Sequence, residues 1–127
     1  MPIETQVLVA AGTVINKAVQ ARMGRIINCG FHDYITLFCE YQNGDETDCE
    51  IEFHVQRTDA LDDSQDQTWS AAAGDKAAVV NTYQLQDGIP HYMTFDVRGI
   101  AFCYFSNAGA TGDGTPTGTI EAAYTLK

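Results

Sequence analysis

Apolar and polar residues alternate with a period of two in the clearest segments of the chain. Residues 34–41 (YITLFCEY) place Ile35, Leu37, Cys39 and Tyr41 on one face. Residues 49–57 (CEIEFHVQR) alternate more regularly, with apolar side chains on one face and Glu, His and Gln on the other. This is the period of a β-strand that buries one face and leaves the other in water.

A turn signal, Asn43-Gly44-Asp45, lies between these two segments. Asn-Gly supplies the positive φ angles of a tight hairpin turn. We therefore expect residues 34–42 and 46–57 to form a hairpin. A three-residue loop would place Cys39 opposite Cys49, and we expect both thiols to be reduced.

Other segments show weaker strand patterns. The pattern in residues 100–107 is apolar on both faces, which predicts a central strand buried on both sides. Short helical turns are expected at residues 18–23 and 70–73. The remaining expected strands are residues 6–15, with a bulge at Gly12, and residues 25–29, 76–86, 91–98 and 119–126.

About eight strands result, with turn signals at intervals of about 8–12 residues, as in sandwiches and barrels. The sequence therefore predicts an all-β fold of antiparallel strands in a two-sheet sandwich, jelly-roll-like or immunoglobulin-like. We expect a single domain over residues 1–127, with a short N-terminal arm of about residues 1–5.

The composition narrows the range of partners. Hydrophobic residues make up 45% of the chain, enough for a core, and the formal net charge is −10. Scattered basic residues and this acidity disfavour nucleic acids and anionic membranes. The chain has no signal-peptide pattern and no apolar run of about 20 residues, so we expect a soluble protein made in the cytosol.

Candidate metal ligands are few. An acidic loop carries Asp59, Asp62, Asp63 and Asp66, which offer calcium the right ligand type but lack EF-hand spacing. We interpret it as a solvated loop. His32, His54 and His91 are not brought together by the pattern, which places His54 on a wet strand face. The four cysteines form no CxxC pair, so no metal and no cofactor are expected.

Catalytic patterns are absent from the sequence. No nucleophile elbow occurs, and Glu50 and Glu52 share one strand face without a facing carboxylate. The glycine-rich residues 109–118 precede an expected strand and not a helix, so we interpret them as a long hairpin tip and not as a phosphate loop. The chain is therefore not expected to be an enzyme.

Aromatic side chains offer a further candidate site. A sugar-stacking platform or ordinary core packing would account for Trp69, Tyr41, Tyr83, Tyr92 and Tyr104. Phe38 and Phe105 lie on the strand faces opposite Leu37 and Phe102. Burial on both faces of a sheet explains them, and so does burial against a neighbouring subunit.

Residues 33–59 (DYITLFCEYQNGDETDCEIEFHVQRTD), followed later by Trp69, resemble small β-sandwich proteins encoded among bacteriophage virion genes. Residues 97–105 (VRGIAFCYF), a Gly/Thr/Pro tip and residues 118–126 (GTIEAAYTL) fit the same pattern. The resemblance covers roughly residues 30–127 and includes no catalytic motif. After residues 43–47 (NGDET), where other members carry a small polar residue, this chain has Asp48-Cys49. This difference does not disturb the alternation of apolar and polar residues.

The resemblance implies a virion protein: a capsid decoration (cement) protein, or a tail or baseplate part. It implies that the partners are other virion proteins. It also implies a homo-oligomer, for which we expect a trimer. We expect docking through the N-terminal arm (Pro2, Ile3, Thr5) and through the tip (Thr111, Asp113, Thr115, Pro116). The alternatives are a carbohydrate- or receptor-binding module and a cupin-type barrel enzyme.

Overall fold

The structure, a computed structural model, describes residues 4–15, 21–42, 48–56, 77–110 and 118–127. Within this part of the chain all regular structure is β-strand, and no helix is long and apolar enough to cross a membrane. The strands are β1 (Gln6–Val14), β2 (Ala21–Arg22), β3 (Ile27–Asn28), β4 (Tyr34–Gln42), β5 (Asp48–Gln56), β6 (Ala77–Leu85), β7 (His91–Asp96), β8 (Phe102–Ala110) and β9 (Thr119–Leu126).

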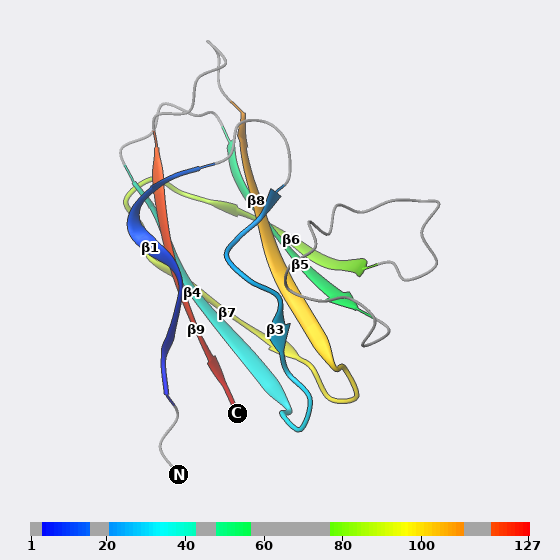
Figure 1. Cartoon of the computed structure of the whole chain (residues 1–127). Coiled ribbons are helices and arrows are strands. Elements are labelled where there is room, and N and C mark those ends of the chain that lie inside the picture. The colour runs from blue at the N-terminus through cyan, green and yellow to red at the C-terminus, as the bar shows by residue number, and fades with distance from the viewer. Residues whose placement is uncertain (1–3, 16–20, 43–47, 57–76, 111–117) are drawn as a thin grey trace.

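The strands form two antiparallel sheets that face each other (Figure 1). The first sheet has the order β1-β9-β4-β7. The second has the order β2-β8-β5-β6, and β3 pairs with β8 beside β2. When β2 and β3 are taken as one interrupted edge strand, each sheet has four strands. This confirms the predicted all-β, two-sheet sandwich.

The connections between the strands define the type of sandwich. The chain changes sheet after β1, β3, β4, β6, β7 and β8, whereas β5 and β6 follow one another in sequence and pair directly. Repeated crossing between two four-stranded sheets is the jelly-roll arrangement. Of the two predicted types, the structure therefore has the jelly roll.

The predicted hairpin between residues 34–42 and 46–57 is wrong. β4 pairs with β7 and β9, whereas β5 pairs with β6 and β8 in the opposite sheet. Alternation shows only that both strands bury one face, and facing each other across the core satisfies it as well as lying side by side. Cys39 and Cys49 point into the core from opposite sheets, and burial, and secondly the charge of Cys49, raise the pKa of Cys39 to about 12. All four cysteines are buried free thiols.

The predicted hairpin tip at residues 109–118 is wrong for the same reason. β8 and β9, which flank it, belong to different sheets, so this stretch connects the sheets. Its predicted docking residues Thr111, Asp113, Thr115 and Pro116 lie outside the described residues.

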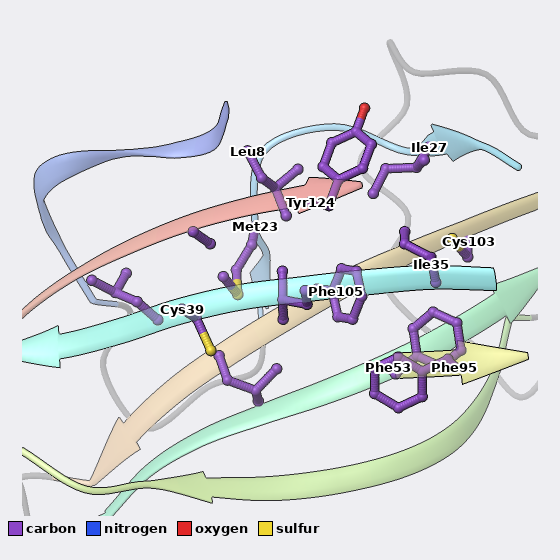
Figure 2. Close-up of a cluster of buried hydrophobic side chains, with 14 of the residues drawn as sticks. Leu8, Met23, Ile27, Ile35, Cys39, Phe53, Phe95, Cys103, Phe105 and Tyr124 are labelled. Carbon is purple, nitrogen blue, oxygen red and sulfur yellow. The ribbon is translucent and has the colours of Figure 1, made fainter. Parts of the chain in front are cut away.

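An aromatic cluster joins the two sheets within the core (Figure 2). The rings of Phe53 on β5 and Phe95 on β7 stack with centroids 4.2 Å apart, and Phe105 on β8 lies 5.1 Å from Phe53. β8 is the central strand predicted for residues 100–107, and residues 103–107 are all buried. Both faces of β8 are therefore covered.

The segment between β2 and β3 closes one side of the sandwich. Met23 is buried in the core, and Arg25 donates hydrogen bonds to Gln6 Oε1 at 2.9 Å and to the Tyr124 hydroxyl at 2.7 Å. Arg25 thus ties this segment to β1 and β9. The predicted helical turn at residues 18–23 is wrong where it can be judged, because residues 21–22 form β2 and pair with β8.

Removing the Phe53 ring should destabilise the fold far more than removing the exposed Phe38 ring. We expect Phe53→Ala to lower the free energy of unfolding by about 3–5 kcal/mol, because it leaves a cavity between the sheets. Phe38→Ala should change it by less than about 1 kcal/mol. Urea denaturation measures both, and equal losses would contradict the assignment of Phe53 to the core.

Two glycines with positive φ offer a matched test of the side closure. A Cβ at Gly24 (φ 65°) would lie 2.5 Å from the Leu8 carbonyl oxygen, whereas one at Gly12 (φ 85°) would meet nothing within 4 Å. Gly12→Ala should cost about 1–2 kcal/mol of stability through backbone strain alone. Gly24→Ala adds a steric clash and should cost about 2–5 kcal/mol. Thermal melts measure both variants. Equal melting temperatures for Gly24→Ala and Gly12→Ala would rule out the close packing of Gly24 against Leu8.

Candidate binding groove

The outer face of the first sheet carries a row of apolar side chains, one from each strand. Val7 pairs with Ala123, Ala123 with Phe38, and Phe38 with Tyr92. The side chains of Val7, Phe38 and Tyr92 are 64%, 43% and 73% exposed. The Phe38 and Tyr92 rings lie 6.3 Å apart. We call these four residues the apolar row.

An acidic pair lies beside the apolar row. Glu40 follows Phe38 by two positions on β4 and pairs directly with Glu121 on β9, so both carboxylates lie on the outer face. The Gln42 side chain donates a hydrogen bond to Glu40 Oε1. On the other side of the row, the hydroxyl groups of Thr36 and Thr94 form a hydrogen bond of 2.8 Å.

The apolar row and the acidic pair line one open groove with a volume of about 650 Å³. The small side chain of Ala123, between Val7 and Phe38, leaves room at its floor. The groove is lined by Val7, Val9, Ala10, Ala11, Phe38, Cys39, Glu40, Pro90, His91, Tyr92, Glu121, Ala122 and Ala123. Such a surface suits an apolar ligand group with a positive charge nearby.

Burial on the inner face fixes this arrangement. Leu37 and Cys39 point into the core, so Phe38 and Glu40 must point outward. The sequence singled out Phe38 and Tyr92 as candidates. It missed Val7, Ala123 and Glu121, because the strand order that brings them beside β4 has no local signature.

The other aromatic candidates lie elsewhere. Tyr41 and Tyr104 are buried, and Phe105 belongs to the core. Trp69 and the side chain of Tyr83 lie outside the described residues. Of the predicted stacking platform, the structure places Tyr92 in the groove.

The second sheet holds a buried polar cluster around His54. His54 Nε2 lies 2.8 Å from Ser106 Oγ and 3.3 Å from Glu52 Oε2, and the imidazole stacks on Tyr104 with centroids 4.4 Å apart. His54 is 4% exposed, and burial lowers its pKa to about 4. Its Nδ1 has no hydrogen-bond partner among the described residues, so Nε2, which faces both oxygens, carries the proton.

The prediction that His54 lies on a solvent-exposed strand face is wrong, because the side chain is buried. The side chain does point to the outer face of its sheet, but neighbouring side chains cover it there. Ile26 packs on Tyr104 and Phe102 on that face. The cluster does not have the geometry of a catalytic triad, because Ser106 and Glu52 approach the same ring nitrogen, and Ser106 is 3% exposed.

The remaining predicted site residues are not gathered by the structure. Thr5 is exposed ahead of β1, whereas Pro2, Ile3 and the calcium candidates Asp59, Asp62, Asp63 and Asp66 lie outside the described residues. His91 Nε2 accepts the Gln86 backbone N–H at 3.3 Å. In the described part of the chain, no three His, Cys, Asp or Glu side chains form a group that could hold a metal ion.

Fold and groove together define the class: a jelly-roll sandwich with an open, apolar, acid-flanked groove on one sheet. No family model and no curated protein matches the sequence. Among solved structures, the crystal structure of the SPBc2 prophage-derived protein YomS has a similar fold, with a TM-score of 0.52 and 13% sequence identity. The match covers 99% of this chain and 94% of that one.

His54 should make the stability of the fold depend on pH. Its pKa is about 4 when folded and about 6.5 when unfolded, so its contribution is fully present above pH 6.5 and is lost as the pH falls toward 4. The loss should approach about 1.4 kcal/mol per pH unit within that window. Burial, and secondly Glu50, raise the pKa of Glu52, which opposes the loss at the acidic end.

Urea denaturation across this pH range, for the wild type and His54→Phe, isolates the histidine. The phenylalanine ring of the variant would still stack on Tyr104, but it has no group that titrates between pH 4 and pH 6.5. Its stability should vary less with pH than that of the wild type. Parallel profiles would show that His54 titrates normally.

Proposed function

We propose that this chain is a non-enzymatic structural component of a bacteriophage virion that docks on another virion protein through the groove. Within that class we favour a capsid decoration protein, made in the host cytoplasm and assembled onto the head lattice. A tail or baseplate position is the alternative within the same class. The homo-oligomer expected from the resemblance, a trimer, belongs to the same proposal.

The apolar row is the observation that carries the proposal. Val7, Phe38 and Tyr92 are exposed along one row, with Ala123 between Val7 and Phe38, and contiguous exposed apolar surface is typical of protein interaction sites. Covering Phe38 and Tyr92 would contribute about 1–2 kcal/mol each to binding. The similarity in fold to a prophage-derived protein supports the phage assignment.

The buried His54 cluster supports a role without catalysis at that position. A reacting group needs access to substrate, and Ser106 and His54 have almost none. Their hydrogen bonds stabilise the second sheet, so a structural role accounts for them.

Purified particles of a phage that encodes this chain test the proposal. Quantitative mass spectrometry of gradient-purified virions should find the chain in many copies, at a fixed ratio to the major capsid protein. Labelled antibodies in electron microscopy should then place it on the head. Its presence in infected-cell lysate but not in purified particles would overturn the proposal.

A carbohydrate- or receptor-binding module is the second candidate, favoured by the exposed Tyr92 ring beside the Glu40 and Glu121 carboxylates. An aromatic face with nearby acceptors can hold a sugar. A glycan array should then give hits that Tyr92→Ala abolishes. An array without hits would remove this candidate.

A further inference from the structure

The groove combines an apolar row with a pair of like charges, and the pair is the less expected feature. Glu40 and Glu121 stand directly opposite each other on neighbouring strands. Like charges in that position destabilise a sheet. Among the described residues, neither carboxylate forms an ion pair. Glu40 accepts a hydrogen bond from the Gln42 side chain, and a cation bound here would be attracted by both carboxylates.

The two features are spaced like the side chains of an extended peptide. Phe38 and Glu40 are two positions apart on β4, and Ala123 and Glu121 are two positions apart on β9. That separation is about 7 Å, the same as between alternate side chains of any extended segment. A segment lying along β4 would place one side chain over Ala123 and the next but one over the acidic pair.

We propose that the groove binds an extended segment of a partner protein in which an aliphatic side chain and a Lys or Arg lie two positions apart. The aliphatic side chain fills the space over Ala123, between Val7 and Phe38. The basic group lies between Glu40 and Glu121. This inference rests on the proposed function, because it specifies the partner that the groove takes.

Charge complementarity selects this occupant over a second copy of the chain. The formal net charge is −10, so a second copy brings further negative charge toward the acidic pair, whereas a basic segment neutralises it. A glycan fits less well, because the groove is lined mainly by Val, Ala, Phe and Pro side chains. A basic, aliphatic peptide segment matches both parts of the groove.

A synthetic peptide series measures this directly on the intact chain. The probe is fluorescein-labelled Thr-Leu-Thr-Lys-Thr-Leu-Thr, compared with versions that carry norleucine or glutamate in place of the lysine. Fluorescence anisotropy should show the lysine peptide binding at least about tenfold more tightly than the norleucine peptide, and the glutamate peptide weakest. Raising the salt concentration should reduce the difference.

Variants assign the effect to the acidic pair. In the double variant Glu40→Gln/Glu121→Gln the three peptides should bind alike, and its melting temperature should rise because the repulsion is gone. Asp33→Asn removes an exposed carboxylate before β4, at the end of that strand away from Glu40, and should keep the preference for lysine. Phe38→Ser should weaken the binding of all three peptides.

Two results would overturn the inference: no binding of the lysine peptide, or an equal preference for lysine in the double variant. Binding of a second copy or of an oligosaccharide to the groove, without peptide binding, would also overturn it. These failures differ from failure of the proposed function. A chain that is present in virions, with the double variant incorporated as well as the wild type, would retain the virion role and lose the basic partner.

Discussion

Burial of apolar side chains between the two sheets determines which side chains point outward from the first sheet. The stacked rings of Phe53 and Phe95 join β5 to β7 across the core, and in the same core Ile35, Leu37, Ile51 and Val97 are at most 1% exposed. A slip of one residue in β4 would expose Leu37 and bury Glu40, at a cost far larger than any surface contact can return. The register of the first sheet is therefore fixed, and so is the order of its outward side chains.

That fixed register turns four unrelated positions in the sequence into one surface. Val7, Phe38, Tyr92 and Ala123 come from β1, β4, β7 and β9, and the jelly-roll connections place these strands side by side. Binding needs no mobile loop for this surface, because the groove lies on paired strands. A rigid surface loses little conformational entropy on docking, which suits the docking role proposed for this chain.

Local pattern was enough to predict the strands other than β2, the inward faces of β4, β5 and β9, and the central position of β8. Pairing was not predictable, because an Asn-Gly signal indicates a turn without saying whether the next strand stays in the same sheet. The hairpin at residues 34–57 was wrong for that reason. His54 was predicted to be solvent-exposed because alternation gives only a side chain's direction, whereas the ring stacked on it belongs to Tyr104, which is distant in sequence. Phe38 could be singled out, but Glu121 could not.

The central claim is that this chain docks through the apolar row, and particle assembly with a groove variant tests it most directly. A phage that carries Phe38→Ser/Tyr92→Ser should incorporate the protein at least about tenfold less than a phage that carries Asp33→Asn, while both proteins fold and accumulate equally in the cell. Equal incorporation of the two variants would contradict the account and move the docking surface elsewhere on the molecule.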